Sequence, residues 1–204
     1  EADKLYKKGL KKFPNSGVLY SDYGEVLYQK DPASPACIKA WEKGIEVDPN
    51  FSRNYYNACR YYGTAGNNLW CLVYGEMFVN IESYSTKTIE IKNILFDIYK
   101  QWFISGNAAG ATTLFEKQFT LALNKQNREA SFGLTPDALT AIRARFILEW
   151  FNGKETPAFR LFEYQRQLLQ EGLFEAYNQW LFGSISNAAT YQNWISTHTE
   201  ESTA

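Results

Sequence analysis

Histidine is almost absent from this sequence, which contains only His198, close to its C-terminal end. A catalytic or zinc-binding histidine needs partners at a defined spacing, and no second histidine or cysteine pair stands near it. We therefore interpret His198 as an exposed residue of the C-terminal segment. Glycine-rich phosphate loops and the glycine-flanked serine of hydrolases are missing as well. The sequence thus predicts no cofactor, no metal site and no enzymatic activity.

Cysteine is scarce too. The three cysteines are odd in number and widely spaced, so they form neither a disulfide framework nor a paired-cysteine metal site. We predict that they are small buried residues. For Cys59 and Cys71 a second interpretation stays open, in which the two lie on adjoining helices and form a disulfide in an oxidising compartment.

Long hydrophobic runs and an excess of one charge are also lacking. No apolar stretch approaches the roughly 18 residues that a membrane-spanning helix requires, so the sequence predicts no membrane insertion. The formal net charge at pH 7 is -1, which favours neither nucleic acid nor an anionic membrane surface. Lysines form one stripe near the start of the chain: Lys4, Lys7, Lys8, Lys11 and Lys12. Such a stripe is typical of a solvated helix face.

Aromatic residues, in contrast, are abundant. They make up 17% of the sequence, whereas prolines number only six. Because runs of alternating Val and Thr are absent, this composition predicts an all-α fold in which helices pack through large side chains. The 204 residues are enough for a large core, as one extended domain or as two small ones.

The first half of the chain contains an internal repeat. Pro14-Asn15 and Pro49-Asn50 each close a helix-like segment, and a small, an aromatic and a small residue precede both pairs at the same spacing. These residues are Ala2, Tyr6 and Gly9 before the first pair, and Cys37, Trp41 and Gly44 before the second. After the pairs, the segment 20–27 aligns with the segment 55–62.

This pattern resembles the tetratricopeptide repeat (TPR), a helix-turn-helix unit of about 34 residues. The first unit fills the signature slots of that family with similar residues: Tyr20, Tyr23, Gly24, Leu27, Cys37, Trp41 and Pro49. A second unit begins at 55–62, and we expect a third first-helix over 91–98. The resemblance implies a right-handed array of helical hairpins over 1–104, in which small residues let the two helices of a hairpin approach closely.

The repeat register also bears on the start of the chain. Residues 2–14 match only the second helix of a repeat, so we expect that a preceding first helix has been trimmed from this piece. A signal peptide or further repeats would then lie upstream. The sequence resembles bacterial repeat proteins of this type, some of which are exported, and it leaves a cytoplasmic and a periplasmic location open.

Residues 105–204 lack the repeat signature but are also predicted to be helical. Thr135-Pro136 and Thr156-Pro157 each match an N-cap followed by proline at the first helical position, and Asn152-Gly153 matches a helix end between them. Further helices are predicted near 107–124, 173–182 and 186–197. We expect this half to be a helical C-terminal cap that packs with the repeats as one continuous unit and covers their last hydrophobic face.

In the TPR family the first helices of the repeats line a concave groove that binds peptides. The groove positions of the family correspond here to one candidate peptide-binding set: Glu25, Tyr28, Arg53, Tyr56, Asn57, Arg60, Lys92, Asn93 and Phe96. Their mixture of acids, bases and rings suits an extended peptide better than nucleic acid, which needs uniform positive charge. The resemblance therefore implies a non-catalytic scaffold that binds a protein or peptide partner in this groove.

Two other interpretations stay open. In a structural or self-associating module, the groove would be filled by the C-terminal helices of the same chain or by a second copy, and Tyr56 and Arg60 would be buried there. An enzyme with an unrecognised site in the second half would need a deep pocket among 136–197 with at least two converging titratable groups.

Overall fold

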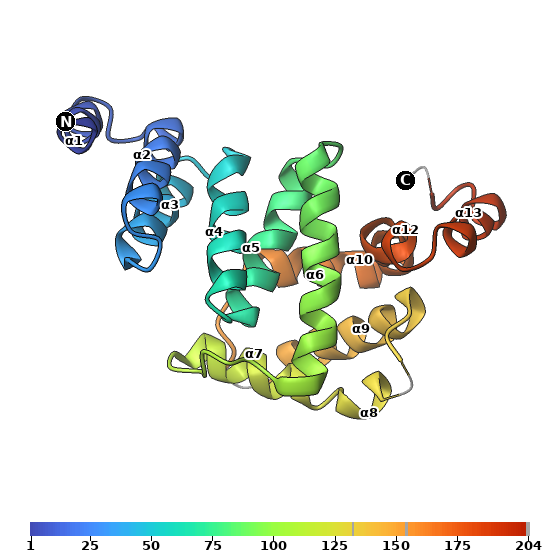
Figure 1. Cartoon of the computed structure of the whole chain (residues 1–204). Helices are drawn as coiled ribbons and strands as arrows, with labels where there is room; N and C mark the ends of the chain where they lie inside the picture. The colour runs from blue at the N-terminus through green and yellow to red at the C-terminus, as the bar shows by residue number, and fades with distance from the viewer. Residues whose placement is uncertain (132, 154, 203–204) are drawn as a thin grey trace. The chain divides into compact units, whose positions relative to one another are not determined.

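The computed structural model describes residues 1–131, 133–153 and 155–202, apart from the side chain of Glu129, and every regular element in these ranges is a helix (Figure 1). The predicted all-α class is therefore confirmed. The chain divides into two compact units, Glu1–Leu95 and Phe96–Ala204, and the division lies within the helix α6 (Thr86–Ser105). Each unit is described here by itself.

The first unit consists of five complete helices and the beginning of a sixth. These are α1 (Ala2–Lys12), α2 (Gly17–Lys30), α3 (Pro35–Val47), α4 (Ser52–Thr64), α5 (Asn68–Ile81) and α6 as far as Leu95. In this unit α2 packs against α3, and α4 packs against α5 (Figure 1). Short polar side chains start the helices: Ser16 Oγ accepts a hydrogen bond from the Leu19 amide, and Asn67 Oδ1 accepts one from the Trp70 amide, each at 3.3 Å.

Glycine lets α2 and α3 approach each other closely. A Cβ atom at Gly24 would lie only 2.2 Å from Nε1 of Trp41, which itself donates a hydrogen bond of 3.1 Å to the backbone oxygen of Ser21. Gly44 makes similar room for Asn54, whose Nδ2 would lie 2.4 Å from an added Cβ. The small-residue slots of the repeat pattern therefore receive large neighbouring side chains.

The core of the first unit is rich in tyrosine. Trp41 lies in a buried cluster with Cys37, Ile38 and Ala58. Beside it, the rings of Tyr62 and Tyr74 stack with their centroids 5.8 Å apart, and both hydroxyls donate to Oε1 of Glu42, at 2.8 and 3.2 Å. Burial, reinforced by the Glu42 carboxylate, raises the pKa of Tyr74. Tyr74 therefore stays protonated and keeps its hydrogen bond to Glu42.

The second unit continues from Phe96 along α6. Its other elements are α7 (Leu114–Asn124), α8 (Asn127–Ala130), α9 (Pro136–Asn152), α10 (Arg160–Gln170), α11 (Phe174–Asn178), the π-helix η1 (Gln179–Gly183), α12 (Ser184–Ser186) and α13 (Ala188–Thr197). Aromatic rings from α7, α9 and α10 and from the residue before α10 form one cluster: Phe115, Phe119, Phe146, Trp150, Phe159 and Phe162. None of the described helices is both long and apolar enough to cross a membrane.

The structure confirms one predicted helix start in this unit and overturns another. Thr135 caps α9, since its Oγ1 accepts a hydrogen bond of 3.1 Å from the Ala138 amide, and α9 ends at Asn152 as predicted. The predicted cap at Thr156 is wrong, because α10 begins only at Arg160. Thr156 Oγ1 instead donates to the backbone oxygen of Trp150 at 2.8 Å and so closes the end of α9.

The prediction that His198 is exposed is also wrong. Its ring is half-buried and stacks on that of Trp194, with the centroids 4.8 Å apart and the planes within 6° of parallel. Nδ1 of His198 lies 2.9 Å from Oγ1 of Thr197 and 3.1 Å from the backbone oxygen of Trp194. The histidine therefore closes the end of α13.

Candidate functional site

One surface of the first unit gathers most of the candidate residues, and we refer to it as the polar face. It is formed by α2, α4 and the part of α6 before Leu95, and consists of Asp22, Glu25, Arg53, Tyr56, Asn57, Arg60 and Glu90. Arg53, Asn57 and Arg60 lie on one side of α4, because residues three and four apart in a helix share a face.

Arg53 connects α4 to α2. Its Nη1 lies 3.0 Å from Oδ1 of Asp22, and its Nη2 lies 3.9 Å from Oε1 of Glu25. The side chains of Arg53, Asp22 and Glu25 are 41%, 36% and 34% exposed, so solvent screens the pairs and each contributes on the order of 0.2–1 kcal/mol. The main consequence is positional, because the two carboxylates hold the guanidinium in place and offset its charge.

Glu90 connects α4 to α6 in the same way. Its Oε2 accepts a hydrogen bond of 2.8 Å from the hydroxyl of Tyr56, and its Oε1 lies 3.3 Å from Nε of Arg60. The ring of Tyr56 is 8% exposed and contacts two cations, Arg60 at 5.4 Å and Lys87 at 4.9 Å from its centroid. Burial and the hydrogen bond to Glu90 both raise the pKa of Tyr56, so its hydroxyl stays a donor.

Asn57 differs from its charged neighbours because its amide nitrogen has no partner. The side chain is 6% exposed, and Nδ2 makes no hydrogen bond within the part of the chain that the structure describes. A buried donor left unpaired costs about 1–3 kcal/mol. Asn57 thus keeps a buried, unpaired donor on the side of α4 that also carries Arg53 and Arg60.

Lys92 and Asn93 follow Glu90 on α6 and lie in contrasting environments. Lys92 is 8% exposed, and burial lowers the pKa of its ammonium group to about 8. Asn93 is exposed, and its Nδ2 donates a hydrogen bond of 2.8 Å to the backbone oxygen of Ile89 on the same helix. Asn93 therefore uses one of its donors on its own helix.

The remaining two candidates contact aromatic neighbours. Tyr28 is partly buried against the core cluster of the first unit, with its ring centroid 5.9 Å from that of Trp41. Phe96 belongs to the second unit, where it is 6% exposed and its ring lies 6.1 Å from that of Phe182. The structure thus pairs Glu25 with Arg53, and it joins Tyr56 to Arg60 through Glu90. It places Tyr28 and Phe96 in hydrophobic packing.

Sequence reasoning missed Glu90, which joins Tyr56 to Arg60, and Lys87, which lies over the Tyr56 ring. The spacing of opposite charges in the sequence contained a signal that could have identified Glu90. Asp22 and Arg53 are 31 residues apart, and Arg60 has an opposite charge at a similar separation in Glu90. Complementary charges about 30 residues apart therefore indicated contacts between α4 and each of α2 and α6.

The cysteines are buried as predicted, each with 0% exposure. Cys59 and Cys71 lie on α4 and α5 as free thiols, with their sulfur atoms 3.4 Å apart. The contact with Cys71 and burial both raise the pKa of the Cys59 thiol. The helices α4 and α5 do adjoin at these two residues. A disulfide between Cys59 and Cys71 in an oxidising compartment stays a prediction.

Three comparisons give no relative from which a function can be transferred. No protein-family model, no curated protein and no solved structure matches the chain. Among the described residues, no three His, Cys, Asp or Glu side chains converge as metal ligands would. The functional proposal therefore rests on the geometry of the polar face.

Proposed function

We propose that the first unit is a TPR-like array, and that the protein is a non-catalytic scaffold that binds an extended peptide of a partner protein on its polar face. The packing of successive helices supports the array. Small residues face large ones where α2 meets α3, at Gly24 and Trp41. A similar close approach recurs where α5 meets α4, since a Cβ at Gly75 would lie 2.9 Å from Sγ of Cys59.

The observation that carries the peptide proposal is the unpaired Nδ2 of Asn57. An extended peptide offers a carbonyl acceptor at every residue, and one such oxygen would satisfy the amide. Neighbouring side chains cover this donor in the free protein, so binding requires the Asn57 side chain or its neighbours to move before a peptide carbonyl can accept from Nδ2. The donor is then already desolvated, and the hydrogen bond is gained without removing water from it.

The paired charges indicate what kind of peptide suits the face. Arg53 is neutralised by Asp22 and Glu25, and Arg60 by Glu90, so neither arginine presents an uncompensated charge. A polyanion such as nucleic acid would have to compete with these carboxylates. We therefore propose that the ligand is an uncharged or mixed-charge segment, recognised mainly through hydrogen bonds.

Selection from a peptide library displayed on phage, with the whole chain as bait, tests this proposal. Peptides that are selected are synthesised, and their affinities are measured by calorimetry. Replacing Asn57 by Ala is expected to weaken binding about tenfold, which corresponds to one hydrogen bond of about 1.4 kcal/mol. The matched control is Lys39→Ala, because Lys39 is exposed on α3 and lies outside the polar face.

Two results would contradict the proposal. If a variant with Arg53, Asn57 and Arg60 all replaced by Ala binds the selected peptides as tightly as the parent chain, the polar face is not the peptide site. If no peptide is selected and sedimentation shows a dimer that the triple variant cannot form, the face is a self-association surface instead.

A further inference from the structure

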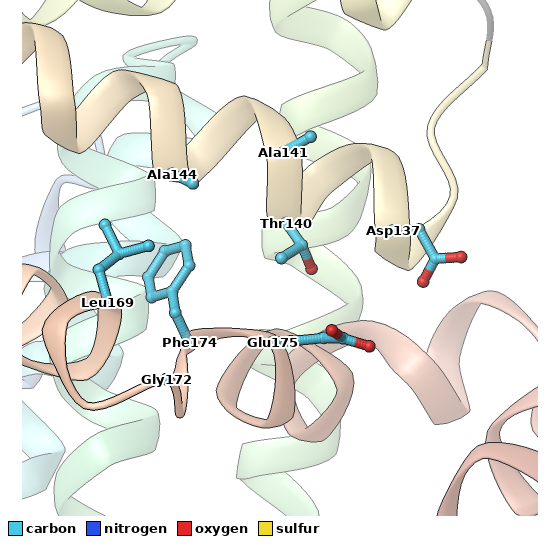
Figure 2. A pocket seen from close by; sticks show the side chains of 8 residues that line it. All are labelled: Asp137, Thr140, Ala141, Ala144, Leu169, Gly172, Phe174 and Glu175. Carbon is cyan, nitrogen blue, oxygen red and sulfur yellow. The ribbon is translucent and has the colours of Figure 1, made fainter.

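A hollow of about 410 Å³ lies between α9 and the segment that joins α10 to α11, within the second unit (Figure 2). Its lining residues are Asp137, Thr140, Ala141, Ala144, Leu169, Gly172, Phe174 and Glu175. The volume falls in the range of small-molecule sites, roughly 300–1,000 Å³. We refer to it as the α9–α11 hollow, and it involves none of the residues of the polar face.

The two ends of the α9–α11 hollow differ in chemistry. Figure 2 shows the apolar side chains of Leu169 and Phe174 facing Ala144 at one end. The oxygen-bearing side chains of Asp137, Thr140 and Glu175 lie at the other end. The hollow is therefore amphipathic, with an apolar floor and an acidic rim.

The acidic rim is held in place but is not neutralised. Oδ1 of Asp137 accepts a hydrogen bond of 3.0 Å from Nε2 of Gln179, and Oε1 of Glu175 accepts one of 3.1 Å from Nε1 of Trp194. Both donors are uncharged. In the described ranges, neither carboxylate forms an ion pair with a lysine or an arginine. The rim thus carries two negative charges beside an apolar cavity.

The apolar floor already contacts a cation from within the protein. The buried guanidinium of Arg143 lies 5.6 Å from the ring centroids of Phe174 and Tyr177, and it donates a hydrogen bond to Oδ1 of Asn178. A second cation over Phe174 would be repelled by Arg143. The ring is therefore suited to the apolar body of a ligand, and the carboxylates are suited to its positive charge.

We propose that the α9–α11 hollow binds a small organic cation, with its apolar body against Leu169 and Phe174 and its ammonium group between Asp137 and Glu175. Charge complementarity carries the choice of ligand, because the hollow pairs an apolar floor with carboxylates that lack a cation. The lining residues include no histidine, cysteine, serine or lysine, and the hydroxyl of Thr140 donates to the backbone oxygen of Pro136 at 2.9 Å.

Titration of the ¹⁵N-labelled full chain with 2-phenylethylamine, followed by NMR, tests this site. The uncharged counterpart 2-phenylethanol has the same shape and serves as the matched ligand. For about nine non-hydrogen atoms we expect an amine dissociation constant of the order of 1 mM. We expect about tenfold weaker binding of the alcohol, with the shifted amides confined to 137–144 and 169–175 for both ligands.

Three variants distinguish the contribution of the rim carboxylates to binding from that of the shape of the hollow. The double replacement Asp137→Asn with Glu175→Gln should weaken amine binding about tenfold and leave alcohol binding unchanged. Ala144→Leu narrows the floor and should weaken both ligands. Glu163→Gln removes an exposed carboxylate of α10 outside the hollow and should change neither affinity. The dispersion of the NMR spectrum shows whether each variant is folded.

Each alternative outcome overturns the proposal. Equal affinities for the amine and the alcohol exclude a role for the carboxylates. Shifts outside 137–144 and 169–175 place the ligand elsewhere. Tighter binding of the dipeptide amide Ac-Phe-Lys-NH₂ than of 2-phenylethylamine, by tenfold or more, assigns the hollow to a basic side chain of a partner protein instead of a small molecule.

Discussion

Single residues of the first unit show two groups whose burial opposes folding. The amide nitrogen of Asn57 lacks a hydrogen-bond partner. Lys92 as a residue is 8% exposed, and burial lowers the pKa of its ammonium group to about 8. Native proteins keep few such groups, and those that persist call for an explanation. Both belong to the set of residues that the TPR resemblance implies for ligand binding, and their cost to stability can be measured.

The free-energy cost of burying the Lys92 ammonium can be measured through the pH dependence of stability. Because the folded-state pKa is about 8 and the ordinary value is 10.5, both folded and unfolded states are protonated below pH 8, and the cost of burying the charge applies in full. Between these values the unfolded state binds more protons, so the stability of the parent chain rises with pH. Lys92→Met should therefore be more stable than the parent by about 2 kcal/mol at pH 7, after allowance for residual solvent screening.

Urea unfolding of the parent and of Lys92→Met at pH 7, 8 and 9.5 provides the measurement. The advantage of the variant should shrink as the pH rises above 8. The control is Lys39→Met, whose difference from the parent should not change with pH because Lys39 is exposed. An advantage of Lys92→Met that stays constant up to pH 9.5 would contradict the lowered pKa.

Asn57 gives the second prediction at this scale. Asn57→Leu removes the unpaired donor at similar volume, so the free energy of unfolding should increase by about 1 kcal/mol. The same change should weaken peptide binding, since the hydrogen bond to the ligand is lost. Thermal unfolding and calorimetry measure the two effects. A loss of stability in Asn57→Leu would show that the amide has a structural partner after all.

At the scale of helices, the sequence predicted the elements whose signals are local. The cap at Thr135 and the end of α9 at Asn152 depend on neighbouring residues only, and both were found. Thr156 carries the same local signal, but its hydroxyl turns back to Trp150. The π-helix that starts at Gln179 had no local sign, because Gln179 bonds to Asp137 on another helix.

The residues of the candidate site also differ in whether local sequence or contacts distant in sequence determine their positions. The spacing of Arg53, Asn57 and Arg60 places them on one side of α4 without knowledge of the fold. The packing of Tyr28 against Trp41 and of Phe96 against Phe182 depends on residues distant in sequence. The contacts that a side chain makes in the folded chain, and not its residue type, therefore decide whether it packs in the core or lies on the polar face.

The α2–α3 contact supplies a prediction at the scale of helices. In Gly24→Ala the new Cβ would lie 2.2 Å from Nε1 of Trp41, so the helices must separate or the hydrogen bond to Ser21 must break. We expect a loss of about 3 kcal/mol or more in the free energy of unfolding, measured by urea denaturation.

Gly9→Ala is the matched control for this substitution. Gly9 also lies in a helix, α1, but the nearest atom to its added Cβ is Cδ1 of Leu19 at an ordinary 3.7 Å. The replacement should stabilise the chain by up to about 1 kcal/mol, because alanine favours the helix more than glycine does. Similar effects of the two substitutions would mean that the close approach at Gly24 is absent.

At the scale of the whole molecule, the positions of the three cysteines make them reporters of the opening of the first unit. Cys37, Cys59 and Cys71 all belong to Glu1–Leu95, and each has 0% exposure. A thiol reagent can reach them only when the first unit opens, so labelling of the reduced native chain should be slow and should report the stability of that unit.

A matched pair of core substitutions tests whether the units open separately. Ile91 belongs to the first unit and Ile147 to the second, and both have 0% exposure. Replacing either by Val should cost about 1 kcal/mol. Ile91→Val should then accelerate thiol labelling about fivefold, whereas Ile147→Val should leave the rate unchanged. Equal acceleration by the two variants would show that the chain unfolds as one cooperative whole.

The contact between Gly24 and Trp41 also limits the order in which this sequence can change by mutation. While the indole occupies the space beside α2, any side chain at position 24 collides with it, so a substitution of Gly24 alone should destabilise the first unit. If a smaller residue replaces the tryptophan first, the position becomes permissive and the glycine is free to drift. The effect of a substitution at position 24 thus depends on which residue stands at position 41.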